Sequence, residues 1–333
     1  MRIQQRPFLS QLLLFALVSL AFLSPAGAAQ RGRAVPFMGR EATAPRALQF
    51  EALPLERSSQ NHLLLRAELN GKPALFVVDT GAPVSAIALN RVAYFRMSAP
   101  GNDAELPSRL QINGGFAKVA VARELQLGAL NLIDQPMVAI DLSSSRRAAR
   151  QADEQAIDGV IGADILFPTS AVLDCRAQML ILKMDETVRG GAPGLDYSGY
   201  TRIPIQVSSG HNLYVDGSFN GTRAKLMVDT GAFGTLMHQP FVRRMKIPMR
   251  KSGLISAAVN LKQRGVQLAT ISRFSVGQLN MRNKEVGVIN LEGLVRSGLL
   301  DASVPVAGLL GSEILAHHNG IIDFGTRTLY LKN

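Results

Sequence analysis

The sequence contains one pattern twice, and this internal repeat constrains the fold more than any other feature. Residues 70–82, NGKPALFVVDTGA, match residues 220–232, NGTRAKLMVDTGA, at an offset of 150. Later patches recur at an offset of 149: LGALNL with VGQLNM (127 and 276), GVIGADIL with GLLGSEIL (159 and 308), and VLD with IID (172 and 321). Similar spacing between separate patches indicates a duplicated structural unit with one residue deleted between the early and late landmarks.

The repeat also suggests how the chain is divided. We expect an N-terminal lobe at residues 51–183, a linker at 184–200 marked by glycine and proline, and a C-terminal lobe at 201–333. Short apolar runs end in turn signals, and Asn70-Gly71 and Asn220-Gly221 predict tight β-hairpins. Each lobe should therefore be built mostly from strands, with helices after each Asp-Thr-Gly (84–95 in the first copy) and a short surface helix or loop at 146–155.

The N-terminus has the pattern of an export signal. Arg2 and Arg6 precede an apolar stretch at 12–23, and Ala26-Gly27-Ala28 offers small residues for cleavage after Ala28. The alternative is an uncleaved membrane anchor, but the stretch is shorter than the ~20 residues that a spanning helix needs. We expect a signal peptide at 1–28, a mobile segment or prosegment at 29–50, and a periplasmic or secreted protein with no stable membrane insertion after cleavage.

Composition narrows the classes of chemistry. The chain is 47% hydrophobic and 18% charged, which is typical of a folded globular protein. A single cysteine, Cys175, excludes an internal disulfide and a cysteine-based metal site, and we expect it to be a buried, inert thiol. The net charge of +11 comes from scattered Lys and Arg in a chain with no Trp and five Tyr, which argues against nucleic-acid binding.

The repeated Asp-Thr-Gly is the candidate catalytic feature. Each copy places an aspartate, Asp79 or Asp229, at the end of an apolar strand, where a carboxylate is costly unless it is paired or used. If the lobes pack around a pseudo-twofold axis, the two carboxylates meet and cannot both ionise. One would keep a proton while the other is charged, so the pair could deprotonate a water and protonate a carbonyl oxygen. The glycines would let the chain turn tightly enough to bring the carboxylates together.

These motifs resemble the aspartic proteases, in particular the bacterial retropepsin-like branch with both halves in one chain. The resemblance rests on Asp-Thr-Gly-Ala after apolar residues, and on Val160-Ile161-Gly162 and Leu309-Leu310-Gly311 some eighty residues later. It implies an all-β, bilobal pepsin/retropepsin-like fold of two β-barrel-like lobes with an active-site cleft between them, and Asp79 and Asp229 as the water-activating dyad. Thr80 and Thr230 would cross-link the lobes by hydroxyl-to-backbone hydrogen bonds. The remaining active-site support would come from Gly81, Ala82, Gly231, Ala232, Gly162 and Gly311.

The sequence departs from the pepsins in one motif position. Ala82 and Ala232 stand where pepsins have serine, as in retroviral enzymes. Asn113, Gly114 and Gly115 form a turn signal that fits two interpretations equally well, a flap over the active site or an ordinary surface hairpin. Arg264-Gly265 is a weaker turn signal in the second copy.

Other candidate residues have no convincing partners. His317 and His318 are adjacent without a third ligand, so no metal or other cofactor is expected. His62, His211 and His238 are isolated and should be structural or exposed. Ser85 lacks a Gly-x-Ser-x-Gly setting, which argues against serine hydrolysis.

Two functions remain open from the sequence. The first is an exported aspartic endopeptidase that acts on polypeptides, for which a monomer is sufficient because one chain carries both half-sites. The second is a non-catalytic peptide-binding or regulatory protein that retains the cleft. Two intact aspartates favour the enzyme.

Overall fold

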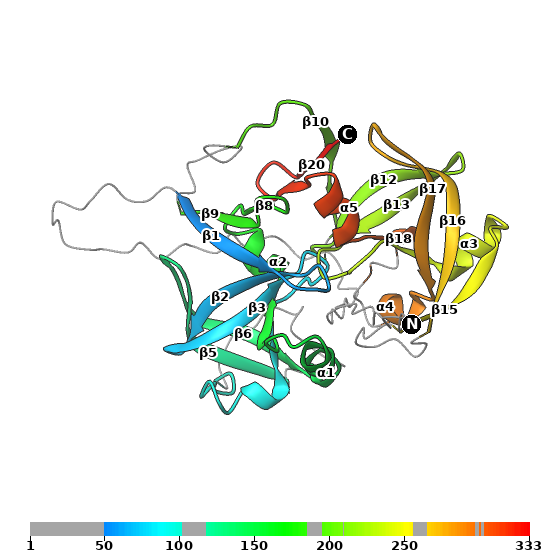
Figure 1. The fold of residues 1–333 in the computed structure, drawn as a ribbon. Helices are drawn as coiled ribbons and strands as arrows, with labels where there is room; N and C mark the ends of the chain where they lie inside the picture. Colours follow the sequence, from blue (N-terminus) through cyan, green and yellow to red (C-terminus); the bar gives the residue numbers. More distant parts are fainter. Residues whose placement is uncertain are drawn as a thin grey trace, which may run out of the picture.

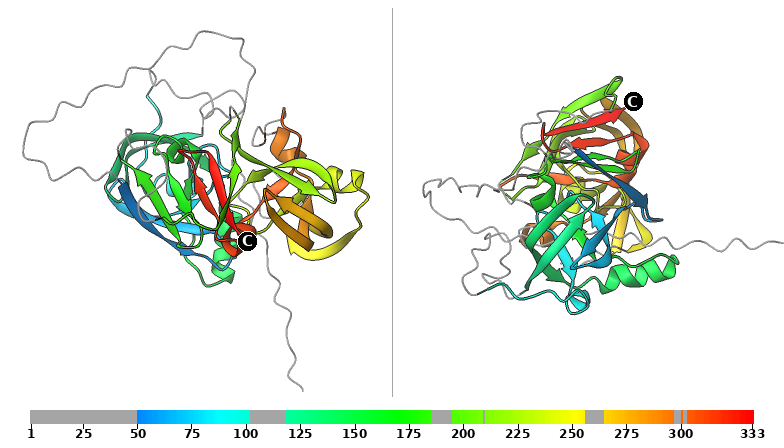
Figure 2. Two further views of the ribbon diagram at one scale, coloured as in Figure 1. Left: turned by 90° about the horizontal axis from the view of Figure 1, so that it is seen from above. Right: turned by 90° about the vertical axis from the view of Figure 1, so that its left-hand side faces the viewer.

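The computed structural model describes residues 50–101, 118–184, 195–208, 210–255, 265–296, 300 and 303–333. Strands dominate and are arranged in two lobes, each built largely from one copy of the repeat (Figure 1). The lobes lie side by side, with strands near the C-terminus between them (Figure 2). The fold is therefore the mostly-β, bilobal architecture that the duplicated sequence predicts.

The first copy forms most of a 12-stranded sheet. Its elements are β1 (Phe50–Arg57), β2 (Leu63–Leu69), β3 (Lys72–Val78), β4 (Ala86–Ala88), the 3-10 helix η1 (Leu89–Arg91), β5 (Val119–Leu127), β6 (Leu130–Ile140), α1 (Ser143–Gln151), β7 (Gly159–Ile161), α2 (Ala163–Leu166), β8 (Val172–Asp174) and β9 (Met179–Lys183).

The second copy repeats this order and forms a separate 8-stranded sheet from β11 to β18. Its elements are β10 (Tyr200–Pro204), β11 (Gln206–Val207), β12 (Leu213–Phe219), β13 (Thr222–Val228), β14 (Leu236–His238), α3 (Gln239–Arg244), β15 (Met249–Ile255), β16 (Gly265–Val276), β17 (Leu279–Ile289), α4 (Glu292–Arg296), β18 (Val306–Leu310), α5 (Ser312–His317), β19 (Ile321–Asp323) and β20 (Thr328–Lys332).

The two predicted hairpins are present at matching places. Leu69 pairs with Lys72 across Asn70-Gly71, and Phe219 pairs with Thr222 across Asn220-Gly221. Both turn residues have positive φ in each copy, 50° and 73° in the first and 50° and 90° in the second. Asparagine and glycine tolerate this conformation better than other residues, so the turn chemistry fixes the register of the strand that leads to each aspartate.

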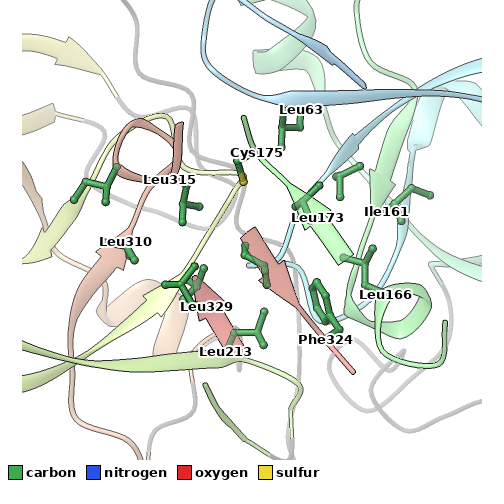
Figure 3. Close-up of a cluster of buried hydrophobic side chains, with 14 of the residues drawn as sticks. Leu63, Ile161, Leu166, Leu173, Cys175, Leu213, Leu310, Leu315, Phe324 and Leu329 are labelled. Carbon is green, nitrogen blue, oxygen red and sulfur yellow. The ribbon is translucent and has the colours of Figure 1, made fainter. Parts of the chain in front are cut away.

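Strands of the two copies also share one sheet. Its order is β10-β20-β19-β8-β9-β1, and the copies join where β19 pairs with β8, Ile321 opposite Asp174. One hydrophobic cluster likewise contains residues of both copies, drawn in Figure 3. Its labelled members are Leu63, Ile161, Leu166, Leu173 and Cys175 from the first copy and Leu213, Leu310, Leu315, Phe324 and Leu329 from the second. This shared sheet and core fix the lobes relative to each other.

A charged pair is buried within this shared region. Lys183 at the end of β9 and Asp323 at the end of β19 have side chains that are 2% and 0% exposed, and Lys183 Nζ lies 4.0 Å from Asp323 Oδ1. The position in the second copy that matches Lys183 is Lys332, which is exposed. The two copies therefore differ here in burial although both have lysine.

The helix expected at 84–95 is mostly wrong. Ala86–Ala88 form β4, which pairs with both β6 and β7, and only the short η1 follows it. In the second copy β14 occupies the matching place and is followed by α3. The surface helix expected at 146–155 is present as α1, displaced toward the N-terminus.

Candidate active site

The two aspartates occupy equivalent places at the ends of two strands. Asp79 follows β3, which runs parallel to β7, and its amide donates to the Ile161 carbonyl (3.0 Å). Asp229 follows β13, parallel to β18, and its amide donates to the Leu310 carbonyl (3.0 Å). Both aspartates are 0% exposed, so each carboxylate is held by a buried pair of strands.

The two Asp-Thr-Gly loops lie against each other. A Cβ on Gly81 would be 2.6 Å from Asp229 Cγ, and a Cβ on Gly231 would be 2.4 Å from Asp79 Oδ2. Real Cβ atoms essentially never come this close to another atom, so a side chain at either position would force the opposite carboxylate to shift. Each glycine thus lets the opposite carboxylate approach its loop, and the structure brings Asp79 and Asp229 together.

Thr80 and Thr230 make the expected reciprocal hydrogen bonds between the copies. Thr80 Oγ1 donates to the Val228 carbonyl (2.8 Å) and accepts from the Thr230 amide (3.1 Å). Thr230 Oγ1 donates to the Val78 carbonyl (2.8 Å) and accepts from the Thr80 amide (3.0 Å). All four bonds are buried, so the threonines join the two loops beneath the aspartates.

Burial raises the pKa of both carboxyl groups above the ordinary aspartate value. For Asp79, the charge of Asp229 raises the pKa further, and hydrogen bonds from the amides of Gly81 and Gly231 oppose the rise. For Asp229, hydrogen bonds from the Asp79 side chain and from the amides of Gly231 and Ala232 oppose the rise in pKa. Oδ2 of each aspartate is buried without a hydrogen-bond partner among the described residues. Such a pair favours one shared proton and one negative charge.

Gly162 and Gly311 sit directly behind the loops, where α2 and α5 begin. A Cβ on Gly162 would be 2.7 Å from the Ala82 carbonyl oxygen, and one on Gly311 would be 2.3 Å from the Gly234 carbonyl carbon. The amides that follow the two glycines donate to the carbonyls of Ala82 and Ala232 (both 2.8 Å). Both alanines are fully buried, so these positions support the loops by close backbone packing.

Side chains behind the loops add contacts that the motifs do not indicate. Ser85 Oγ accepts from the Gly162 amide (3.0 Å) and donates to Asp164 Oδ1 (2.7 Å). Ser312 Oγ donates to the Thr230 carbonyl (2.8 Å). His62, which the sequence leaves as an isolated histidine, is 4% exposed and places Nε2 3.1 Å from the Gly231 carbonyl oxygen. No local spacing could reveal these contacts, because their partners are far away in the sequence.

The proposed flap of the first copy, Asn113, Gly114 and Gly115, lies outside the described residues. In the second copy Gly265 begins β16, which pairs with β15 as an antiparallel hairpin, Ile255 opposite Gly265. Arg264 lies outside the described residues, as do the predicted signal peptide and residues 29–49.

Cys175, His317 and His318 are the remaining candidates from the sequence. Cys175 is buried, and burial raises the pKa of its thiol to about 12. His317 and His318 pack edge to face (4.8 Å between ring centroids), and the described residues contain no group of metal-binding side chains. In the part of the chain that the structure describes, no helix has the length and apolar character to cross a membrane.

Comparisons with known proteins give the following matches. A family model described as aspartyl protease matches residues 65–165, and one described as gag-polyprotein putative aspartyl protease matches residues 215–317. Matches among solved structures include basic 7S globulin from soybean (11% identity, 85% of this chain and 95% of that chain, TM-score 0.42) and the aspartic proteinase from Irpex lacteus (12%, 85% and 97%, TM-score 0.42). No curated protein gives a significant match.

The two family matches cover equivalent parts of the duplicated chain. One contains Asp79 and Gly162, the other contains Asp229 and Gly311, and together they span more than half of the sequence. Because each copy independently matches an aspartyl protease model, the chain belongs to the aspartyl proteases.

Proposed function

We propose that this protein is an exported aspartic endopeptidase whose catalytic dyad is Asp79 and Asp229. The observation that carries the proposal is the pair of buried carboxylates, each held against the glycine of the opposite Asp-Thr-Gly loop. This arrangement supports general acid–base hydrolysis, because one carboxyl group is charged while the other holds a proton.

The chemistry follows from this shared proton. The charged carboxylate takes a proton from a water molecule, whose oxygen attacks the peptide carbonyl carbon, while the protonated carboxyl group donates to the carbonyl oxygen. The resulting tetrahedral diol breaks down when the carboxyl group that took the water proton gives it to the leaving nitrogen and the C–N bond breaks. The other carboxylate takes a proton from one diol hydroxyl, so a carbonyl forms again and the dyad regains its single shared proton. The substrate class is therefore a polypeptide, and the step needs no metal ion or cofactor.

The decisive test compares the wild-type protein with the variants Asp79→Asn and Asp229→Asn. We expect each substitution to reduce peptide cleavage by at least about a thousandfold, because an amide can neither accept nor donate the proton that the step requires. Peptides from a digested proteome, analysed by mass spectrometry after incubation, would show the cleavage. Near wild-type turnover in either variant would refute the mechanism, and peptide binding without cleavage by the wild type would favour the non-catalytic alternative.

The single chain should be active as a monomer, because it supplies both aspartates. Specific activity should stay constant as the enzyme is diluted, with light scattering at each concentration to report whether monomer or dimer is present. A fall in specific activity that follows dissociation of a dimer would contradict this proposal.

Export is supported by the N-terminal pattern of Arg2, Arg6, the apolar stretch and Ala26-Gly27-Ala28. We expect the mature protein, expressed in a bacterial host, to be found in the periplasm or the medium with Ala29 as its first residue. N-terminal sequencing would check the site, and a cytoplasmic protein that retains residues 1–28 would refute it.

A further inference from the structure

His62 reaches from the first copy to the aspartate loop of the second. It lies between β1 and β2, where its amide donates to Ser58 Oγ (3.1 Å) and its carbonyl accepts from the Ser58 amide (3.0 Å). Its buried ring places Nε2 3.1 Å from the Gly231 carbonyl oxygen. A carbonyl oxygen can only accept, so Nε2 must carry the hydrogen of this bond.

The Gly231 carbonyl belongs to the same rigid peptide as the Ala232 amide. That amide donates to Asp229 Oδ1 (3.0 Å), next to the bond from the Gly231 amide (2.9 Å). Because a peptide unit is planar, fixing its oxygen also fixes the direction of its N–H. The hydrogen bond from His62 therefore acts on Asp229 through the Gly231–Ala232 peptide.

The amide contacts at the aspartate differ in the first copy. Asp79 Oδ1 accepts from the Gly81 amide (2.8 Å). The Ala82 and Ala232 amides both donate to the main-chain carbonyl of their own aspartate (3.2 and 3.3 Å), but the Ala232 amide also donates to Asp229 Oδ1 (3.0 Å). The residue that matches His62 is Asn212, whose amide nitrogen lies 3.4 Å from Met227 Sδ within its own copy. The two carboxylates therefore differ in the number of amide donors at Oδ1, and donors favour the charged form.

We propose that His62 is a positioning residue that holds the Gly231–Ala232 peptide and so makes Asp229, rather than Asp79, the charged member of the dyad. This inference deepens the proposed function and rests on it: Asp229 would take the proton from water, and Asp79 would donate to the substrate carbonyl oxygen. The charge of Asp229 raises the pKa of Asp79, while two amides oppose the rise at each group: those of Gly81 and Gly231 at Asp79, and those of Gly231 and Ala232 at Asp229. The division of roles therefore rests on the hydrogen bonds at Oδ1 and on the His62 contact.

The proposal requires the hydrogen bond and not a charge on the imidazole ring. His62 also lines a small cavity beside α1, and Glu154 is the only charged residue among the described residues that line it. Glu154 Oε1 accepts from the Ser59 amide (2.5 Å), in the turn that carries His62. On the other side of His62 lies the Gly231 loop, which contacts the two aspartates. A pH experiment must therefore distinguish the titration of Glu154 from the titration of the dyad.

The first experiment measures directly which aspartate ionises first. The full protein is labelled with ¹³C at the aspartate carboxyl groups, and the two signals are assigned with Asp79→Asn and Asp229→Asn. In the wild type we expect the Asp229 signal to move at lower pH than the Asp79 signal. Ionisation of Asp79 first, or of both together, would overturn the proposal.

The second experiment tests His62 itself by steady-state kinetics on a peptide that the wild type cleaves. His62→Phe keeps a ring but removes the donor, and His62→Gln keeps an N–H near the position of Nε2. We expect His62→Phe to lower kcat by about 10- to 100-fold with less than about a threefold change in KM, as is typical when a supporting contact is lost. We expect His62→Gln to stay within about threefold of the wild type in kcat.

The pH profile separates positioning from simple loss of stability. The acidic limb of kcat/KM reports ionisation of Asp229, so loss of the His62 bond should move that limb to higher pH by about half a unit or more. His62→Gln should restore it. The control His317→Phe makes the same change at the exposed end of α5 and should leave the pH profile of kcat/KM unchanged. Glu154→Gln should not move the acidic limb of that profile.

An unchanged acidic limb in His62→Phe would overturn the proposal, as would equal kcat losses in His62→Phe and His62→Gln. If His62→Phe does not fold, His62→Asn, which copies Asn212, takes its place under the same criteria. The carboxyl titration needs no substrate, so it also separates the two proposals. Cleavage by the wild type with Asp79 ionising first refutes only the role of His62, whereas the expected order without any cleavage refutes the proposed peptidase.

Discussion

The two Asp-Thr-Gly loops have the same backbone hydrogen bonds but different side chains behind them. Asp79 and Asp229 each donate from the amide to the neighbouring parallel strand at 3.0 Å, and Ala82 and Ala232 bond back to the aspartate carbonyls at 3.2 and 3.3 Å. Ser85 and its counterpart Thr235 both accept from a glycine amide, Gly162 at 3.0 Å and Gly311 at 3.3 Å, but Ser85 also donates to Asp164 Oδ1. The duplicated backbone therefore sets the dyad, while single side chains make its two members unequal.

The second loop is held by groups that the first lacks. Ser312 donates to the Thr230 carbonyl, whereas its counterpart, Ala163, has no hydroxyl. Behind this loop, Glu313, which matches Asp164, pairs with Lys284 (3.1 Å). A shared-proton mechanism needs one acid and one base, so this inequality suits the chemistry better than perfect symmetry would.

The largest stability difference between the copies is expected at the matched lysines 183 and 332. Lys183→Met leaves Asp323 as a buried charge without its cation, which should cost about 3–5 kcal/mol in the free energy of unfolding. Lys332→Met changes an exposed residue and should cost less than about 0.5 kcal/mol. Urea denaturation of both variants measures the difference, and equal small losses would show that the buried pair does not stabilise the shared sheet.

Thr80 and Thr230 occupy a place where the two copies should contribute equally to stability. Thr80→Val and Thr230→Val each leave a buried carbonyl and a buried amide unpaired, so each should cost about 2–4 kcal/mol. Because the four bonds are reciprocal, the two losses should agree within about 0.5 kcal/mol. Denaturation of both variants under one condition measures the two losses. A much larger loss of unfolding free energy at one site would show that the two threonines do not contribute equally to stability.

The hairpins could be predicted from the sequence because they depend on local chemistry, and the repeat placed the two aspartates at equivalent positions. Asn-Gly fixes a turn wherever it occurs between strands, and two Asp-Thr-Gly copies at one spacing indicate that Asp79 and Asp229 meet. The helix expected at 84–95 was wrong because Ala86, Ile87 and Ala88 pair on both sides in a buried sheet. Tertiary pairing there overrides the helical preference of alanine and leucine.

Contacts between the copies could not be read from the repeat. A repeat shows which segments are alike, but not that β19 of the second copy pairs with β8 of the first. His62 was treated as an isolated histidine because its partner, Gly231, is 169 residues away. Ser312 replaces Ala163 where GSEIL matches GADIL. Nothing in the sequence shows that its hydroxyl donates to the Thr230 carbonyl.

The aspartates should destabilise the fold at neutral pH. Burial raises the pKa of both above the ordinary aspartate value near 3.8, so the folded protein binds protons more tightly than the unfolded chain. Their contribution is favourable below that ordinary value and is lost as pH rises through the raised values. Asp79→Asn and Asp229→Asn should therefore raise the free energy of unfolding by about 1–3 kcal/mol at pH 7–8, since one pKa unit is worth about 1.4 kcal/mol.

Thermal denaturation across the pH range checks this prediction. The stability advantage of the asparagine variants should shrink as pH falls toward 4, because the wild-type carboxyls then become neutral as well. Asp164→Asn serves as a control, since Asp164 lies behind the first loop and accepts from Ser85. Asparagine variants less stable than the wild type at pH 8 would show that the carboxylates are compensated within the fold.

The smallest expected effect concerns Ser312, the hydroxyl that distinguishes the second loop from the first. Ser312→Ala removes one neutral hydrogen bond to the Thr230 carbonyl and should cost about 1 kcal/mol in the free energy of unfolding and a few-fold in kcat. If Ser312 and His62 brace the same loop, their effects on kcat should not be additive, and the coupling in Ser312→Ala/His62→Phe should exceed about 0.5 kcal/mol. The control double variant Ser312→Ala/Glu285→Gln pairs Ser312 with an exposed residue of β17 and should be additive. Additive losses in both double variants would mean that the two side chains act on the dyad separately, so that the difference between the copies would lie in individual contacts and not in the rigidity of one loop.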